Sequence, residues 1–170
     1  CDKAGDLNEY GAKLTGLNIG TTVAVPVIDA HVALPSAGVT QDGGLLIIMG
    51  TSACHIVLSK SDVKVKGICG KVKDGVAKGY YAYEAGQAGF GDILDWFVNN
   101  WVPNRYYEEA KSNGISIFDY LNKKASELEM GKNSVIALDW WNGNRTPYAN
   151  YSLSGLVFGL NLKTKPEEIY

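Results

Sequence analysis

Two short apolar runs that flank a glycine turn constrain this chain of 170 residues more than any other feature. The runs are residues 45–49 and 53–59, and the turn between them is Gly50, Thr51 and Ser52. Runs of this length, rich in isoleucine and valine and bounded by glycine, are typical of buried strands. The sequence therefore predicts two consecutive strands joined by a tight turn.

The turn itself allows two interpretations. Gly50 lets the backbone approach a ligand closely, because glycine has no Cβ. Exposed N–H groups and the hydroxyls of Thr51 and Ser52 suit phosphate oxygens. The three residues taken alone favour a plain hairpin without a ligand, so a phosphate site needs support from the rest of the sequence.

Composition narrows the class of protein. Hydrophobic residues make up 46% of the chain and charged residues 20%, which is ordinary for a globular domain. A net charge of −2 gives no indication of a nucleic-acid or membrane partner, and no apolar run reaches the roughly 18 residues of a membrane-spanning helix. Three cysteines without CxxC spacing favour a reduced, cytoplasmic setting, and with only two histidines they argue against a zinc site.

Strand and helix patterns are mixed along the chain. The expected strands are residues 21–28, 45–49, 53–59, 79–86 and 134–138; the expected helices are residues 6–16, 92–102, 116–131 and 151–160, with a further helix start at 164–167. Such a mixture predicts an α/β fold. The chain begins with Cys1 instead of methionine and stops at Tyr170 within a predicted helix start, so we expect a fragment of a longer protein.

Asp29 is the first candidate for chemistry. It follows an apolar run, at a position where side chains of α/β folds point into a cleft. A carboxylate there can act as a general base or a metal ligand, although a lone aspartate after a strand more often caps a helix. His31, two residues further on, either orients Asp29 or is a structural histidine.

Glu84 and Arg145 are the other candidates. Glu84 ends a predicted strand before a glycine turn, so it either accepts a hydrogen bond from a substrate hydroxyl or is an exposed strand end. Arg145 either binds an anion or ties its loop down through carbonyl groups or Asp139. Trp140 and Trp141 either stack on a sugar or belong to the core. Together these residues indicate hydroxyl and phosphate chemistry.

Four motifs in register resemble the ribulokinase branch of the FGGY carbohydrate kinases. They are residues 27–31, 49–55, 83–87 and 138–145. Residues 155–160 are also similar to the start of the second signature of that family. The resemblance covers essentially the whole chain. It implies part of the α/β fold shared by actin, hexokinase and the Hsp70 ATPase, the ribonuclease H-like ATPase fold.

The resemblance also implies roles for individual residues. Residues 1–43 resemble the end of the N-terminal sugar-binding domain, and residues 44–170 resemble the first part of the C-terminal nucleotide-binding domain. Asp29 matches the catalytic base and a substrate-binding position, and Glu84 matches a ligand of the ketose hydroxyls. The turn of Gly50, Thr51 and Ser52 matches the loop that contacts the ATP phosphates. No side chain of this chain is expected to form a metal site of its own.

The implied activity is transfer of a phosphoryl group from ATP, with Mg²⁺, to a terminal hydroxyl of L-ribulose or a close pentulose. The alternatives are another kinase of the same family, for xylulose or ribitol, and a carbohydrate- or nucleotide-binding module without catalysis. The first phosphate loop and the adenosine segment of the family are not found in the sequence, so we expect these 170 residues alone to be inactive. An exposed interface can lead the chain to self-associate as a homo-oligomer.

Overall fold

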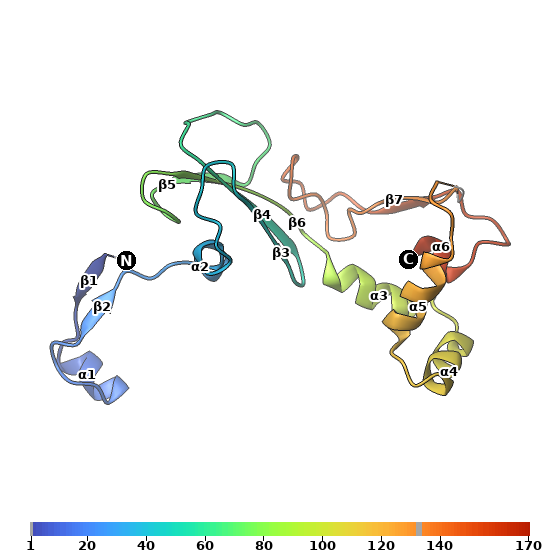
Figure 1. Cartoon of the computed structure of the whole chain (residues 1–170), viewed down its shortest axis with the longest axis horizontal. Helices are drawn as coiled ribbons and strands as arrows, with labels where there is room; N and C mark the ends of the chain where they lie inside the picture. Colours follow the sequence, from blue (N-terminus) through green and yellow to red (C-terminus); the bar gives the residue numbers. More distant parts are fainter. Residues whose placement is uncertain (1, 132–133) are drawn as a thin grey trace.

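A four-stranded antiparallel sheet lies at the centre of the molecule (Figure 1). Its strands are β3 (Leu45–Met49), β4 (Ala53–Ser59), β5 (Gly70–Lys73) and β6 (Tyr81–Gln87), in the spatial order β3-β4-β6-β5. The computed structural model describes residues 2–131 and 134–170. The predicted hairpin is confirmed, because β3 pairs with β4 from Leu45 opposite Val57 to Met49 opposite Ala53.

One face of this sheet is covered by the helix α2 (Asp29–Ser36). Its Leu34 is fully buried and packs with Ile56 and Leu58 of β4. Side chains alternate between the faces of a strand, and Glu84 pairs with Ile56, so Glu84 lies on the face that α2 covers. Burial of a leucine side chain stabilises a fold by about 1.5–3 kcal/mol, and here it holds α2 against the sheet.

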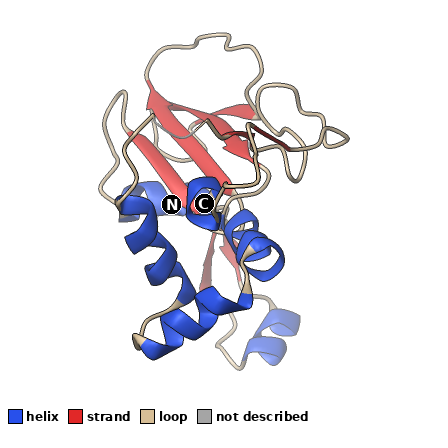
Figure 2. Ribbon diagram, turned by 90° about the vertical axis from the view of Figure 1, so that its right-hand side faces the viewer, coloured by secondary structure: helices blue, strands red, loops and turns tan. Residues whose placement is uncertain are grey.

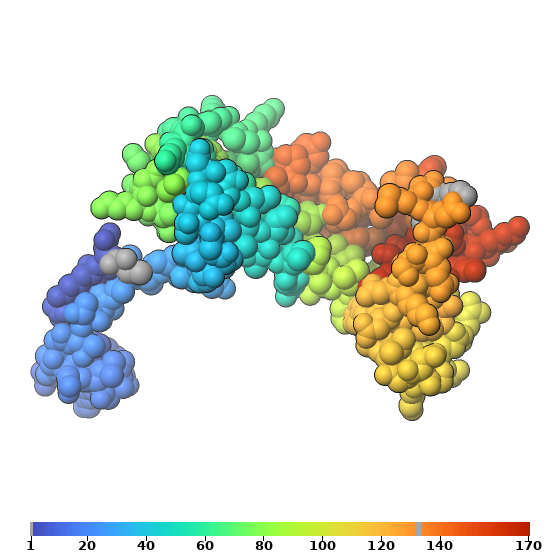
Figure 3. All heavy atoms as spheres, viewed as in Figure 1, coloured from blue at the N-terminus to red at the C-terminus, as the bar shows by residue number. Residues whose placement is uncertain are grey.

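The N-terminal segment forms an arm that projects from the sheet (Figures 1 and 3). It consists of β1 (Lys3–Asp6), α1 (Glu9–Thr15) and β2 (Thr22–Ala24), with β1 and β2 antiparallel. The predicted helix is present, but its cap is Asn8, whose side-chain oxygen accepts a 2.9 Å hydrogen bond from the N–H of Gly11. Asp6 ends β1 instead. Gly16 ends the helix in the left-handed conformation, as expected.

The C-terminal part of the chain forms a second core, whose helices lie below the strands in the view of Figure 2. Its elements are α3 (Gly91–Trp101), α4 (Asn104–Ser112), α5 (Ile117–Ser126), β7 (Ile136–Leu138), β8 (Leu156–Phe158) and α6 (Pro166–Ile169). The prediction of α3 is confirmed, α4 has no counterpart in the sequence prediction, and α5 ends several residues before the expected end. Among the described helices, none has the length and apolar character needed to cross a bilayer.

The prediction of one strand over residues 21–28 is wrong in its second half. β2 ends at Ala24, and Asp29 begins a helix instead of closing a strand. Pro26 has no N–H to donate to a strand ladder, so pairing cannot continue through it. The residues from Asp29 onward follow the helical period, which lets α2 pack its Leu34 on the sheet.

The prediction of a helix over residues 151–160 is also wrong. This segment contains β8, which pairs antiparallel with β7, with Ile136 opposite Phe158. Gly159 has a φ of 90°, and a Cβ there would collide with the carbonyl oxygen of Ser134. The glycines that suggested close helix packing therefore allow close approach of a neighbouring strand segment instead.

Candidate active site

A cleft of about 480 Å³ lies between the start of α2, the β3–β4 turn and the middle of β6. The lining residues are Ile28, Ala30, Ile48, Gly50, Thr51, Ser52, Cys54, Glu84 and Arg145. The fold thus brings the glycine turn and Glu84 together in one cleft. The fold also brings Arg145, from the loop that follows β7, into the cleft. Arg145 contacts Glu84 there, although the two residues are 61 positions apart and no local sequence pattern indicated the contact.

The glycine turn is held by the start of α3. The carbonyl oxygens of Gly50 and Thr51 accept hydrogen bonds from the N–H groups of Gly91, at 2.9 Å, and Phe90, at 2.8 Å. Within the turn, the N–H of Gly50 donates to the carbonyl oxygen of Ser52 at 3.0 Å. A Cβ on Gly91 would lie only 2.7 Å from the carbonyl oxygen of Gly50, so α3 can approach the turn only with glycine there. The turn is therefore a positioned loop with its hydroxyls beside the cleft.

Asp29 is the first residue of α2 and is exposed. Its Oδ1 accepts a 2.8 Å hydrogen bond from the N–H of Ala30. The N-cap position belongs to Ile28, so the interpretation of Asp29 as the cap is wrong. The neighbours Ile28 and Ala30 line the cleft, and Asp29 lies between them at its edge without being a lining residue. A carboxylate in the first turn of a helix is electrostatically favoured.

Glu84 lies in the middle of β6, between Ile56 of β4 and Gly70 of β5, so the interpretation as a strand end is wrong. Its Oε1 accepts a 2.6 Å hydrogen bond from Nη2 of Arg145, and its Oε2 lies 3.5 Å from Nε2 of His31. His31 therefore faces Glu84 and not the carboxylate of Asp29. Arg145 binds a side-chain carboxylate instead of the loop carbonyls or Asp139.

Burial and neighbouring charges determine the protonation states of Cys54 and Arg145 in the cleft. Burial, together with the negative charge of Glu84, raises the pKa of the Cys54 thiol to about 11, so this thiol is protonated at neutral pH and is a poor nucleophile. Burial acts to lower the pKa of Arg145, but the hydrogen bond and charge of Cys69 and the charge of Glu84 together raise it. Arg145 is therefore a permanent cation. Cys54 and Cys69 are free thiols, and Cys1 lies outside the described residues.

Metal-binding side chains do not gather in the described part of the chain. Residues 2–131 and 134–170 contain no group of three His, Cys, Asp or Glu side chains placed to hold an ion.

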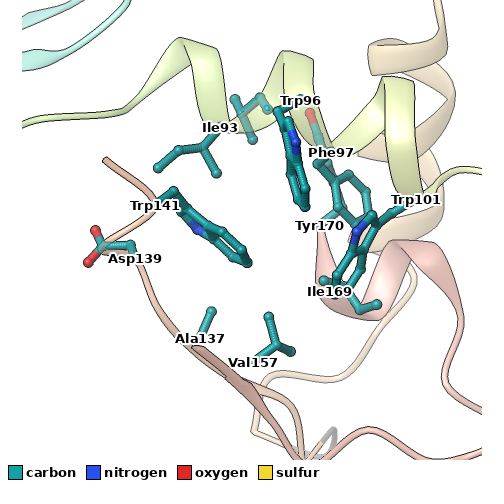
Figure 4. Close-up of a pocket in the computed structure, with 11 residues that line it drawn as sticks. Ile93, Trp96, Phe97, Trp101, Ala137, Asp139, Trp141, Val157, Ile169 and Tyr170 are labelled. Carbon is teal, nitrogen blue, oxygen red and sulfur yellow. The ribbon is translucent and has the colours of Figure 1, made fainter. Parts of the chain in front are cut away.

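A second, aromatic pocket lies between α3, the β7–β8 hairpin and α6 (Figure 4). It has a volume of about 150 Å³, and Trp141 points into it, with its ring centroid 5.3 Å from that of Trp96. Ala137 and Val157 lie opposite these rings in Figure 4. Trp140 instead packs edge-on against Tyr148. Both tryptophans thus pack within the protein, and neither is among the residues that line the cleft.

Comparison with known proteins identifies relatives over almost all of the chain. The model of the FGGY family of carbohydrate kinases, C-terminal domain, matches residues 45–170. A ribulokinase from Bacillus licheniformis is 48% identical over 169 residues, which cover 99% of this chain and 31% of that protein. A ribulokinase from Halalkalibacterium halodurans is 47% identical over 169 residues, which cover 99% of this chain and 30% of that protein.

Solved structures show the same fold at low sequence identity. A xylulose kinase from Rhodospirillum rubrum superposes with a TM-score of 0.76 at 23% identity, over 98% of this chain and 31% of that one. A ligand-bound xylulose kinase from Lactobacillus acidophilus gives a TM-score of 0.77 at 13% identity, over 99% of this chain and 32% of that one. The expected actin- and hexokinase-like ATPase fold, present in part, is confirmed.

The chain spans about 31% of the length of the first of these curated relatives. The family model, in contrast, covers most of this chain, from the first strand of the central sheet to the last residue. By its sequence and its fold, the chain belongs to the FGGY family of carbohydrate kinases.

Proposed function

We propose that the protein containing this chain is an ATP-dependent kinase that phosphorylates the terminal hydroxyl of L-ribulose or a close pentulose. The observation that carries the proposal is the shared cleft, in which the glycine turn and Glu84 line one cavity beside the start of α2. A phosphate-binding turn and a hydroxyl-binding carboxylate are the two parts that such a reaction needs side by side. Identity of 48% to a ribulokinase supports the choice of sugar.

In this proposal each site residue has one role. Asp29 accepts the proton of the sugar hydroxyl while the hydroxyl oxygen bonds to the γ-phosphorus of ATP and the bond from that phosphorus to ADP breaks. Glu84 accepts a hydrogen bond from a second sugar hydroxyl. Gly50, Thr51 and Ser52 offer N–H groups and hydroxyls to the phosphate oxygens. Phosphoryl transfer needs mainly positioning and charge stabilisation, which these groups can supply.

ATP is the proposed phosphoryl donor, and Mg²⁺ enters with it. In kinase sites this ion is held largely by substrate phosphates and water, with one or two carboxylates. Mg²⁺ would neutralise charge on the transferring phosphate.

The proposed domain division places residues 1–43 with a sugar-binding domain and residues 44–170 with a nucleotide-binding domain. The start of the family match at residue 45 supports this division. The helix α2 lies at the junction, because it precedes the proposed boundary and yet packs on the sheet that follows. Asp29 is therefore carried by the element that joins the two parts. A cytoplasmic location goes with an ATP-consuming sugar kinase.

Replacing Asp29 by asparagine tests the proposed base. In the complete protein that carries this sequence, D29N should lower kcat by about 10²–10⁴-fold, because the amide cannot accept the proton. Binding of the sugar, measured by calorimetry, should persist. Asp95→Asn, an exposed change on α3, is the matched control and should keep full turnover. Retained turnover in D29N would contradict the assignment of Asp29.

A substrate panel tests the sugar class. L-ribulose, D-ribulose, D-xylulose, ribitol and glycerol are offered separately while ATP consumption is followed. Turnover strongest with a ribulose supports the proposal. Preference for xylulose or ribitol would assign another activity of the family. Sugar-binding without ATP consumption would favour a non-catalytic module.

A further inference from the structure

We propose that Arg145 is the positioning residue of the sugar site. It holds Oε1 of Glu84, so that Oε2 is the oxygen left to accept a hydrogen bond from a substrate hydroxyl. This inference rests on the proposed function, in which Glu84 binds the sugar. It adds a residue from the loop after β7 that touches the sugar only through Glu84.

The two oxygens of Glu84 have unequal partners. Nη2 of Arg145 lies 2.6 Å from Oε1, which is the length of a strong charge-assisted hydrogen bond. Nε2 of His31 lies 3.5 Å from Oε2, at the outer limit of a hydrogen bond. The Arg145 and Glu84 side chains are only 28% and 25% exposed, so water screens this ion pair less than one on the open surface. The Cys54 thiol also hydrogen-bonds to the Glu84 carboxylate. Oε1 is therefore the oxygen that is held by a charged partner at short distance, and Oε2 has no such ion pair among the described contacts.

Arg145 can position Glu84 because its own neighbours are fixed. On one side, the Thr146 hydroxyl accepts a 3.1 Å hydrogen bond from the N–H of Gly86, two residues along β6 from Glu84. On the other side, Asn144 is 3% exposed, and its side-chain oxygen accepts a 2.8 Å hydrogen bond from the N–H of Tyr148. The loop is thus tied to the strand that carries Glu84.

Gly86 also allows the guanidinium to lie close to β6. A Cβ at Gly86 would lie 3.4 Å from Nη1 of Arg145, which is close contact, and 2.5 Å from the carbonyl oxygen of Ala53. The glycine therefore permits the close approach of both β4 and Arg145 at this point. The resulting geometry leaves the guanidinium beside the carboxylate on the cleft wall, where both line the same cavity.

Loss of Arg145 should weaken sugar binding and leave ATP binding unchanged. The Glu84 carboxylate would then lose its cation and could rotate away from the substrate hydroxyl. Hydrogen bonds to charged groups contribute enough that their loss changes affinity by about 10- to 100-fold. We therefore expect R145A to raise the sugar KM by that factor, with the ATP KM within about twofold.

The test uses a double-mutant cycle in the complete protein. R145A, E84A and the double variant are compared for sugar KM, ATP KM and kcat. If Arg145 acts through Glu84, the double variant should be no worse than E84A alone, because the two residues share one interaction. R145K, which keeps the charge without the planar fork, should restore part of the affinity. Arg105→Ala on α4 is the matched control, with both KM values unchanged.

Three results would overturn the positioning role. They are multiplicative effects of R145A and E84A on the sugar KM, an R145A effect on the ATP KM instead of the sugar KM, and an unchanged sugar KM in E84A. Thermal unfolding of each variant is followed in parallel, and R145K carries the test if R145A does not fold. Failure of the proposed function itself is seen separately, because the unmodified protein would then show no sugar-dependent ATP consumption.

Discussion

Glu84 shows how distant residues set the chemistry of a single side chain. Its backbone belongs to a strand whose position the sequence predicted, but its carboxylate contacts Arg145 and His31, which are 61 and 53 residues away. A strand pattern reports which residues alternate between faces, and it carries no information about which loop reaches the same face. The contact therefore exists only in the folded molecule.

Gly91, at the start of α3, lies so close to the carbonyl oxygen of Gly50 that a larger residue does not fit there. Replacing Gly91 by alanine should displace the turn of Gly50, Thr51 and Ser52, because the new Cβ would lie 2.7 Å from the carbonyl oxygen of Gly50. We expect G91A to destabilise the chain by about 1–3 kcal/mol, the usual cost of overpacking. In the complete protein it should also raise the ATP KM more than the sugar KM. Denaturant unfolding and steady-state kinetics measure the two effects.

Gly70→Ala is the control for this change. Gly70 also lies in the central sheet, in β5, but a Cβ there would meet nothing within 4 Å. Its substitution should change stability by less than about 0.5 kcal/mol. Equal losses of stability in G70A and G91A would show that the close contact of residue 91 with the carbonyl oxygen of Gly50 does not cause the destabilisation.

At the scale of elements, the strongest local patterns were correctly interpreted. The apolar runs on either side of Gly50 form the β3–β4 hairpin, and α3 ends just before Pro103, which cannot continue a helix. The errors fall where two elements meet. The start of α2 has the local pattern of a strand end, because its packing partner, the β4 face, is remote in sequence. Within residues 151–160, Leu156–Phe158 form a strand and not a helix, because β7 pairs with them.

Tyr106 ties two of these elements together through a buried hydrogen bond. Its hydroxyl, on α4, donates to Oε2 of Glu167 on α6 at 2.6 Å, and Glu167 is only 7% exposed. Y106F should lower the free energy of unfolding by about 1–3 kcal/mol, because it leaves a buried carboxylate without this donor. Denaturant unfolding at pH 8 measures the loss. Tyr10→Phe, at a side chain 72% exposed, is the control and should change little.

The same bond predicts a pH dependence. Burial and the hydrogen bond to Glu167 raise the pKa of Tyr106 to about 12, above the value of about 10 for an unfolded tyrosine. The folded state then holds the proton more tightly, so this stabilisation is complete below pH 10 and is lost as the pH rises toward 12. The difference in unfolding free energy between wild type and Y106F should therefore shrink over this range. A difference that stays constant to pH 12 would contradict the role of this proton.

At the scale of the whole molecule, the chain is elongated (Figure 3). Many of its large apolar side chains are exposed. The strand β3 is at an edge of the central sheet as described, and its residues are apolar on both faces. On the face away from α2, Leu45, Ile47 and Met49 are 50%, 46% and 66% exposed. An edge strand of this kind is a site for association with another chain.

The 170-residue chain should therefore self-associate, and a charge on this strand should oppose it. We expect I47K to shift the sedimentation profile toward the monomer at a given concentration, because lysine on an edge strand disfavours edge-to-edge pairing. Leu162→Lys adds the same charge at an exposed leucine outside the sheet. If both variants reduce association equally, net charge and not the β3 surface is responsible.

The sequence by itself determined the family and those elements that have strong local patterns, such as the β3–β4 hairpin and α3. The patterns that allowed this are local. They are the short apolar runs around Gly50, the proline after α3 and the four motifs in register, and each can be recognised from residues that are close together in the sequence. Only the tertiary structure decided that Asp29 begins a helix and that Arg145 reaches Glu84. These outcomes depend on packing and pairing between segments tens of residues apart, and no window of sequence contains both partners.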